Sequence, residues 1–552
     1  MRLQHSFPAA VALAAITVVV YGPVSAAPAP RPAEPVARVA TANPAVKHNV
    51  KFTRTAAVAT RTPIKHLVVI FDENVAFDHY FGTYPHAQNL AGEPSFYASP
   101  NTPGINGLNS WLLHHNPNLY QPARLSPSQA KTCDQDHAYA AEQKAEDHGL
   151  MDQFVQNTSG SSSSLYCPKG VVMDYFDGNT VTALWNYAQD FAMNDNSYGT
   201  TFGPSTPGAL NLISGDTGTS VCGPASVTLG AAPACSATPP PTSLASNPPT
   251  SSLYGDANPY YDMCSGTNKA TTAALAGNNI GDVMDTAKLT WGWFQGGFDN
   301  CKTTHPTVAY DTYTHVNPAT DTHVVADYSA HHEPFQYYYS TSNPNHLTPS
   351  SPAMIGSTDR ANHQYDLTDF WTAAGSGNLP AVSFLKASAY EDGHAGYSDP
   401  LDEQAFLTGT INKLQQLPSW SSTAVIIAYD DSDGWYDHVF APVANHSSSS
   451  LDVYCGSVSN GAPARCGYGP RLPFLVISPW AKQNYVSQQI TDQSSIISFA
   501  EYNWRLPSPI DAESADAKAG SILDMFDFNQ SASQVAGHKL FVDPRTGRVV
   551  QR

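Results

Sequence analysis

The chain has 552 residues, of which 41% are hydrophobic and 11% aromatic, enough apolar side chains to fill a large globular core. Only 13% of the residues are charged, and the formal net charge is −19. Without residues 1–26, which carry a single charge on Arg2, the net charge would be −20. So acidic a surface repels nucleic-acid backbones and anionic membranes, which excludes nucleic-acid binding as the main function.

The first residues have the features of a secretory signal peptide, which we predict to span residues 1–26. Arg2 supplies the positive region, residues 9–20 the apolar stretch, and 24–26 a small-x-small cleavage site. The apolar stretch is too short for a transmembrane helix, although an uncleaved anchor is the alternative. We therefore expect an exported protein, periplasmic or secreted, without a stable membrane anchor.

The rest of the chain divides by composition. Residues 27–57 are rich in Pro and Ala and are predicted to form a linker. Residues 58–552 are predicted to form a single domain with loop-rich insertions near 215–256 and 300–350, where Pro, Thr, Ser, Tyr and Asn accumulate.

Eight cysteines in an exported chain predict disulfides. Cys222 with Cys235 and Cys455 with Cys466 each enclose a loop rich in Pro, Gly or Ser, and we predict these as local pairs. The pairing of the other four stays open. No two cysteines have the CxxC spacing, so the sequence does not support a thiolate metal site.

Four short apolar runs predict strands, at residues 67–71, 381–385, 424–429 and 473–478. Runs of this length, rich in Val and Ile, fit strands that are buried on both faces. Helical periodicity over residues 402–416 lies between two of them. Strands alternating with helices predict an α/β fold with a mostly parallel central sheet and helices on both faces.

Acidic and amide side chains directly follow two of these runs. Glu73 and Asn74 come after the first run, and Asp430 and Asp431 come after the third. Because ligands of open α/β sheets bind beyond the carboxyl ends of the strands, these side chains are expected to meet there. Three negative charges in one place repel one another unless a cation neutralises them, and oxygen ligands suit a hard divalent cation. The alternative is two ordinary turns rich in Asp and Asn.

A hydroxyl pair, Ser205 and Thr206, stands in a Gly/Pro-framed turn ahead of the apolar stretch 209–213. At a helix N-terminus beside a metal, a hydroxyl becomes a better nucleophile and the N–H groups of the turn can bind an anion. The alternative is an ordinary Ser/Thr N-cap. Histidines near acids can hold phosphoryl oxygens and protonate a leaving alkoxide; the candidates are His137, His331 and His394, with His332 beside the second.

From Ile64 to about Pro507 the chain resembles the bacterial acid phosphatase/phospholipase C family, whose core fold is like that of alkaline phosphatase. The resemblance is carried by the motifs at residues 64–74, 77–83, 203–207, 392–394, 429–438 and 469–473. It implies that Glu73, Asn74, Asp430 and Asp431, together with Ser205, hold one metal ion. It further implies that Ser205 is the nucleophile and that His137, His331 and His394 bind phosphate.

The chain departs from the family pattern at two places. Ala76 stands where the more familiar opening has Ser, and residues 207–209 read Pro-Gly-Ala where phospholipases C tend to have Pro-Asn-Arg. The second departure resembles the acid phosphatase branch. We therefore expect a secreted, metal-dependent acid phosphatase that acts on small phosphomonoesters through a phosphoserine intermediate.

Two alternatives stay open, a phospholipase C that cleaves phospholipid diesters and a secreted protein that binds phosphate without turnover. The oxygen ligands favour Ca²⁺, Mg²⁺ or Mn²⁺, and the nearby imidazoles leave Zn²⁺ or iron open. The sequence does not predict the oligomeric state.

Overall fold

The computed structural model describes residues 58–160, 167–246, 249–306, 324–447, 449, 451–452, 455 and 462–552. The predicted signal peptide and linker lie outside these residues and stay predictions. Part of the predicted insertion near 300–350 also lies outside the described residues. Within the described part of the chain, no helix combines the length and hydrophobicity needed to cross a membrane.

A sheet of eight strands forms the centre of the structure, in the order β14-β11-β15-β1-β16-β17-β4-β18. In that order the strands are Gln364–Asp366, Trp291–Gln295, Val382–Lys386, His66–Asp72, Thr423–Tyr429, Phe474–Ile477, Ala192–Asn194 and Tyr485–Ser487. The four predicted strands are confirmed as β1, β15, β16 and β17. The predicted α/β class with a mostly parallel sheet is confirmed as well.

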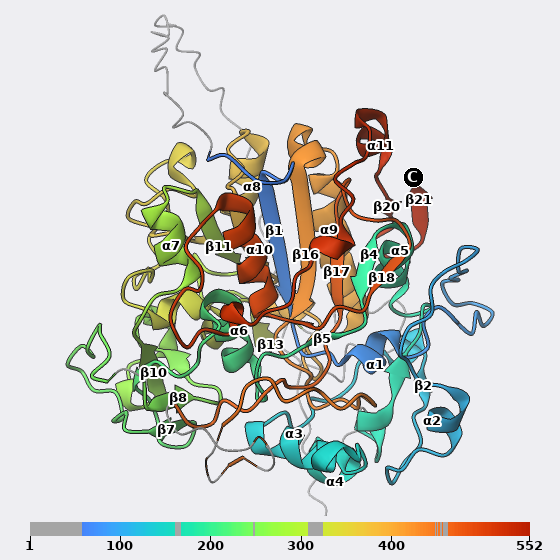
Figure 1. Ribbon diagram of the computed structural model, residues 1–552, viewed down its shortest axis with the longest axis horizontal. Coiled ribbons are helices and arrows are strands. Elements are labelled where there is room, and N and C mark those ends of the chain that lie inside the picture. The colour runs from blue at the N-terminus through green and yellow to red at the C-terminus, as the bar shows by residue number, and fades with distance from the viewer. Residues whose placement is uncertain are drawn as a thin grey trace, which may run out of the picture. The chain divides into compact units, whose positions relative to one another are not determined.

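The pair β1 and β16 occupies the middle of this sheet and runs parallel (Figure 1). Its register sets Leu67 opposite Ala424 and Asp72 opposite Tyr429. Every residue of β16 is buried, as is every residue of β1 after His66, because helices and loops cover both faces. The register therefore ends both strands at the same level and brings the residues that follow them together.

The strand β17 runs antiparallel to β16, and β4 runs antiparallel to β17. The described part of the connection from β16 to β17 contains no helix. Without a crossover, the chain re-enters the sheet from the end at which β16 leaves it, and the new strand must be antiparallel. The connection therefore stays at the carboxyl end of β16, where it contributes side chains to the site described below.

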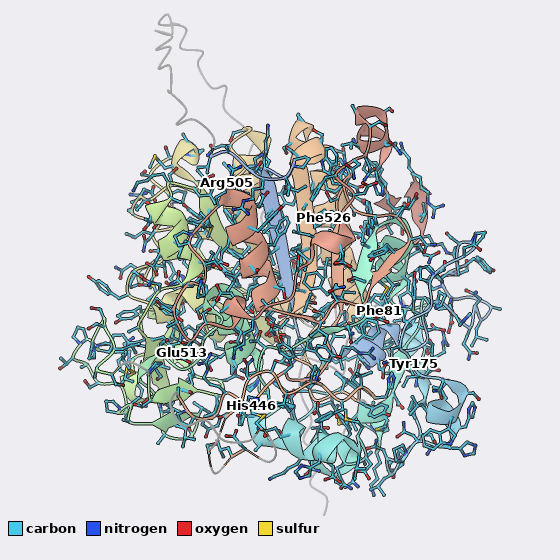
Figure 2. All side chains as sticks on the ribbon, viewed as in Figure 1. Phe81, Tyr175, His446, Arg505, Glu513 and Phe526 are labelled. Atoms are coloured by element: carbon cyan, nitrogen blue, oxygen red, sulfur yellow. A yellow bond between two sulfur atoms is a disulfide. The ribbon has the colours of Figure 1, made fainter. Side chains whose placement is uncertain are left out.

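The predicted helix 402–416 is confirmed as α9 (Pro400–Leu414). Asp399 caps it by accepting the backbone N–H groups of Leu401 and Asp402, and Pro400 takes the first helical position. Its apolar residues join one core with β1 and β16, and this core also includes Phe81 and Phe526, which Figure 2 labels. In Figure 1, α10 (Ser494–Trp504) crosses in front of the sheet, and it contacts α6 (Ser205–Ser214).

Shorter elements surround this core. The other helices are α1 (Phe77–Phe81), α2 (Ser110–His114), α3 (Tyr139–Glu146), α4 (Phe154–Asn157), α5 (Thr182–Asp190), α7 (Ile280–Thr286), α8 (Leu367–Gly375) and α11 (Ala532–Gly537). The short strands pair as β6 (Ser220–Cys222) with β10 (Thr272–Leu275) and β9 (Asn258–Pro259), β7 (Thr228–Gly230) with β8 (Ser251–Leu253), β12 (Thr304–Pro306) with β13 (Val324–Ala326), β5 (Ser197–Tyr198) with β19 (Thr491–Asp492), β2 (Arg124–Leu125) with β3 (Tyr175–Phe176), and β20 (Phe541–Val542) with β21 (Val549–Gln551).

All eight cysteines form disulfides. The two predicted local pairs, Cys222–Cys235 and Cys455–Cys466, are confirmed. The other two bonds are Cys133–Cys167 and Cys264–Cys301, each of which closes a longer segment of chain, the second including β11 of the central sheet. Four disulfides fit an oxidising compartment and so agree with the predicted export.

A buried carboxyl, Glu403 of α9, lies between two tyrosines of the core. Tyr80 donates a hydrogen bond to its Oε2 at 2.9 Å, and Tyr429 donates to its Oε1. Burial raises the pKa of Glu403 from its usual 4.5 to about 8, against the lowering effect of the two hydroxyls. The folded protein therefore favours the protonated carboxyl at neutral pH.

We predict that Glu403 makes the fold less stable as the pH rises. Because its pKa is raised on folding, its contribution to stability is complete below pH 4.5 and is lost as the pH rises toward 8. The loss is at most about 1.4 kcal/mol for each pH unit in that window. Glu403→Gln stays neutral, so its free energy of unfolding should fall less than that of the wild type between about pH 5 and 8 in urea titrations. The exposed Glu513→Gln should follow the wild type; a Glu403→Gln curve parallel to the wild-type curve would contradict the assignment.

Candidate active site

The acidic residues that follow β1 and β16 meet in one buried cluster. Glu73, Asn74, Asp430 and Asp431 are each at most 4% exposed. Two hydrogen bonds tie the loops together: the N–H of Asn74 donates to the side chain of Asp430 at Oδ1, 2.9 Å away, and the N–H of Val75 donates to the carbonyl of Asp431 at 2.9 Å. Asn74 has a φ of 49°, a left-handed conformation that Asn tolerates better than most residues.

The helix α6 begins at Ser205 and brings its hydroxyl to the same cluster. Its first turn packs against the loop after β16 at Gly208, where an added Cβ would lie 2.0 Å from the carbonyl oxygen of Asp430. Only glycine allows this approach. Pro204 is the N-cap, and its side chain makes no capping hydrogen bond. The alternative interpretation of Ser205 as an N-cap is therefore wrong, since its hydroxyl faces the acids.

Three acceptor oxygens surround the Ser205 hydroxyl. Its Oγ lies 3.2 Å from Asp431 Oδ2, 3.3 Å from Glu73 Oε2 and 3.4 Å from Asn74 Oδ1. A hydroxyl carries one hydrogen and can satisfy only one of the three as a donor. Asp430 lies in the same buried cluster, and its Oδ2 has no hydrogen-bond partner in the structure. Such a convergence of oxygens fits a hard cation.

The amide of Asn74 agrees with that interpretation. Its Oδ1 faces Ser205, while its Nδ2 lies 2.9 Å from Nε2 of His394. The reverse orientation would instead donate to Glu73, Asp430 and Asp431 and accept from His394. A cation among the acids selects the first orientation, because oxygen is the atom of an amide that binds metals.

The pKa values of Asp430 and Asp431 show that the charged forms of these acids are unfavourable in the cluster. Burial and the charge of Glu73 raise the pKa of Asp430 to about 6, and burial together with Asp430 raises the pKa of Asp431 well above its usual value. Both shifts mean that the protein alone stabilises these carboxylates poorly. A divalent ion would hold them in the charged form, so the residues present fit the metal that the sequence predicts.

Two further side chains contact the far oxygen of Glu73: Lys386, which the sequence did not predict, and His332, which it named only as the neighbour of His331. Lys386, the last residue of β15, forms an ion pair with Oε1, and Nδ1 of His332 lies 3.0 Å from the same atom. Lys386 is 1% exposed. A lysine within the otherwise apolar run Val382–Lys386 is the signal that could have identified it, because an unpaired lysine is almost never fully buried.

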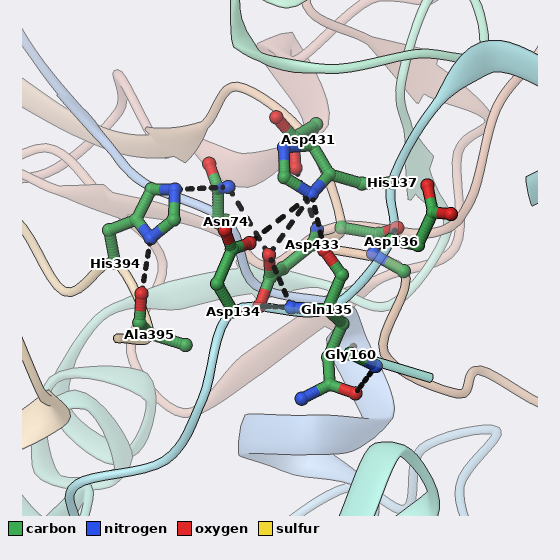
Figure 3. A network of polar contacts seen from close by, with 12 residues as sticks. Asn74, Asp134, Gln135, Asp136, His137, Gly160, His394, Ala395, Asp431 and Asp433 are labelled. Carbon is green, nitrogen blue, oxygen red and sulfur yellow. Dashed lines mark hydrogen bonds and ion pairs between the residues drawn. The ribbon is translucent and has the colours of Figure 1, made fainter. Parts of the chain in front are cut away.

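His137 lies beside the cluster and is held by acids (Figure 3). Its Nδ1 is 3.1 Å from Asp433 Oδ1 and 3.7 Å from Asp134 Oδ1. Burial disfavours a charged imidazole, but Asp431, Asp433 and Asp134 outweigh burial and raise the pKa of His137 well above its usual value. His137 is therefore protonated at neutral pH, which suits a general acid. Asp433, which orients it, was not predicted.

The other predicted histidines lie near the cluster in different ways. His394 donates from Nδ1 to the carbonyl of Ala395 at 2.6 Å, which leaves Nε2 to accept from Asn74. His331 contacts Ser329 at 3.2 Å and packs edge-on against His332. It is therefore His332, the neighbour, that touches Glu73. The roles of His331 and His394 in phosphate binding stay predictions.

One N–H of the turn is already occupied within the protein. The N–H of Thr206 donates to Asp256 Oδ1 at 3.0 Å, and anion binding by the other N–H groups of the turn stays a prediction. Burial would raise the pKa of Asp256, yet His331 and His137 lower it below its usual value. Asp256 thus stays charged and occupies the N–H. The Thr206 hydroxyl points elsewhere, 3.3 Å from the hydroxyl of Tyr337.

A buried arginine fixes the two site loops behind the cluster. Arg471 is fully buried and pairs with Asp78 at 3.0 Å and with Asp437 at 3.1 Å, while His438 also contacts Asp78. Asp78 follows the loop of Asn74, and Asp437 follows the loop of Asp431. Because Arg471 and His438 together offset the charges of these two acids, we assign this group of acids and histidine a structural role.

A cavity of about 350 Å³ lies beside His137. Pro204, Ser159, Gly160 and the segment 134–138 line it, whereas Ser205 and the acids of the cluster are not among its lining residues. Its polar lining suits a charged substrate.

Comparison with known proteins agrees with this arrangement. Residues 64–507 match the Phosphoesterase family. The match includes β1, β16, α6 and every residue of the cluster, and the chain belongs to the Phosphoesterase family.

The chain is similar to several phospholipases C. The non-hemolytic phospholipase C of Pseudomonas aeruginosa is 22% identical over 84% of this chain and 57% of its own length, and that of Burkholderia pseudomallei is 24% identical over 85% and 57%. Phospholipase C A of Mycobacterium tuberculosis is 26% identical over 29% of this chain and 32% of its own length. The chain thus spans little more than half the length of the first two relatives.

A solved Bacteroides thetaiotaomicron protein, described in work on the metabolism of glycosaminoglycans, aligns with 10% identity over 88% of both chains and a TM-score of 0.30. This score is too low to support an argument about the fold.

Proposed function

We propose that this protein is an exported, metal-dependent phosphoric-ester hydrolase in which Ser205 is the nucleophile. The observation that carries the proposal is the position of Ser205 Oγ, 3.2–3.4 Å from three acceptor oxygens at the carboxyl ends of two paired strands. A hydroxyl held by acids that need a cation is an activated nucleophile, whereas a structural serine would cap its helix.

The residues of the site support an in-line displacement. Glu73, Asn74, Asp430 and Asp431 would hold the ion, which, when bound, lowers the pKa of the hydroxyl and offsets the charge that develops on phosphate. Ser205 Oγ forms a bond to phosphorus as the bond to the leaving alcohol breaks. The proton of Ser205 passes to a facing carboxylate, and His137 protonates the leaving alkoxide. Water then attacks the phosphoseryl ester and releases Ser205.

The relatives favour a diester as the substrate. The expectation of an acid phosphatase rested on residues 207–209, Pro-Gly-Ala in place of Pro-Asn-Arg. Gly208 has a packing reason, since a side chain there would collide with the carbonyl of Asp430. The departure therefore carries little information about the substrate, and the named relatives support phospholipase C activity. Phosphomonoester hydrolysis is the second candidate, because the same nucleophile and acid serve both substrates.

We predict that Ser205→Ala lowers kcat by more than about a thousandfold, because it removes the atom that attacks phosphorus. Thermal unfolding should change little, since the hydroxyl makes no helix cap. Thr206→Ala is the matched control, and it should retain most of the activity because its hydroxyl faces Tyr337. Steady-state rates with a chromogenic phosphate ester provide the measurement. Full activity of Ser205→Ala, or loss only in Thr206→Ala, would contradict the proposed nucleophile.

A second prediction concerns the substrate. The wild-type enzyme should cleave a p-nitrophenyl phosphocholine diester with a kcat/KM at least about tenfold above that for p-nitrophenyl phosphate, as expected for a site that discriminates by roughly one good contact. Ser205→Ala, assayed alongside, reports contaminating activity in both cases. A monoester preference of the same size would restore the acid phosphatase as the better assignment.

A further inference from the structure

We propose that Lys386 sets the charge of the metal site and thereby makes it select a divalent over a trivalent ion. This inference rests on the metal site of the proposed function and extends it to the residue that decides the valence of the ion. Lys386 does not face the substrate cavity, and the proposal concerns binding of the ion rather than the chemical step.

The position of Lys386 is fixed by the sheet. The strands β15 and β1 pair in parallel with Leu385 opposite Ile70, so Lys386 ends its strand beside the residues that lead to Glu73. Its ammonium pairs with Glu73 Oε1, and the other oxygen of this carboxylate, Oε2, faces Ser205. Glu73 therefore bridges the lysine and the centre of the site.

Both members of this ion pair lie deep in the protein. Lys386 is 1% exposed and Glu73 is fully buried. The ion pair with Glu73 places the ammonium beside the ion site. Because both members are buried, solvent screens this charge weakly.

Lys386 offsets one of the negative charges that meet at the site. Glu73, Asp430 and Asp431 are three acids, Asn74 and Ser205 are neutral, and Lys386 adds one positive charge. Asp392 lies beside Glu73 and His332 as well, so the inference depends only on the one unit of charge that Lys386 contributes.

The direction of the effect does not depend on the charge of any other group. The repulsion between Lys386 and a bound ion grows in proportion to the charge of the ion, so it penalises a trivalent ion more than a divalent one. Removing the ammonium removes that difference. In a buried site, one unit of charge at close range changes relative affinities by roughly tenfold to a hundredfold.

The test compares Ca²⁺ and Tb³⁺, ions of similar size, on the full chain after removal of bound metal by a chelator. Dissociation constants come from calorimetry and from terbium luminescence. We expect Lys386→Met to raise the preference for Tb³⁺ over Ca²⁺ at least about tenfold, and Lys386→Arg to leave the preference unchanged. Lys413→Met is the matched control: it removes a lysine of α9 that lies over the ring of Trp371 in α8, and it should also leave the preference unchanged.

Several results would overturn the inference. If Lys386→Met weakens both ions equally, the lysine only supports Glu73 mechanically. If wild-type protein binds neither ion, the metal site itself is wrong, and the proposed function fails with it. Failure of phosphatase and phospholipase assays with normal ion selectivity would instead overturn the activity and leave this inference standing.

A second pair of variants covers the case in which Lys386→Met does not fold. Glu73→Gln removes one negative charge and should lower the preference for Tb³⁺. The double variant Glu73→Gln/Lys386→Met removes both members of the buried pair, leaves no unpaired charge and should return the preference close to that of the wild type. Equal preferences in Glu73→Gln and in the double variant would show that the charge of Lys386 has no influence.

Discussion

The structure depends on the placement of several carboxylates in a buried position at the end of two parallel strands. Because the register sets Asp72 opposite Tyr429, the residues that follow the two strands lie side by side. Like charges at such close range repel one another strongly in a protein interior, and positive groups in the surrounding structure offset that repulsion. Lys386 comes from the neighbouring strand, Arg471 and His438 offset the charges of the acids behind the loops, and the oxygens that remain converge on Ser205 as a cation site.

This arrangement separates the residues that hold the site from those that act in it. Hydrogen bonds between the two loops, the close approach at Gly208 and the buried Arg471 hold the geometry without touching a substrate. Ser205 and His137 are the proposed nucleophile and general acid, and carboxylates lie beside each of them. Ser205 faces the carboxylates that would share an ion with it, whereas Asp433 and Asp431 keep His137 protonated. One cluster of negative charge thus favours both a nucleophile and an acid.

Local patterns in the sequence predicted the parts of this site that depend on local structure. Apolar runs marked β1, β15, β16 and β17, and the acids directly after two of them marked the cluster. Contributions that depend on tertiary contacts were missed. Lys386 ends an apolar run and resembles a strand terminus until its partner Glu73 is placed beside it. Asp433 is one of several acids in its loop, and only its contact with His137 distinguishes it. The antiparallel direction of β17 follows from a connection without a crossover helix, and the closure of the Thr206 N–H follows from Asp256, about 50 residues away.

The central claim is that one divalent ion occupies the cluster, and elemental analysis of the purified protein tests it most directly. The account predicts about one divalent ion per chain in the wild type, as expected for a single oxygen-ligand site. It predicts almost none in a variant that carries Asp430→Asn and Asp431→Asn, with the disulfide-linked fold intact by circular dichroism. Substitution of two exposed acids outside the cluster, Asp299→Asn and Glu513→Gln, should leave the metal content unchanged. A metal-free wild type that hydrolyses phosphoric esters at full rate, or a variant that keeps its ion without Asp430 and Asp431, would contradict the account.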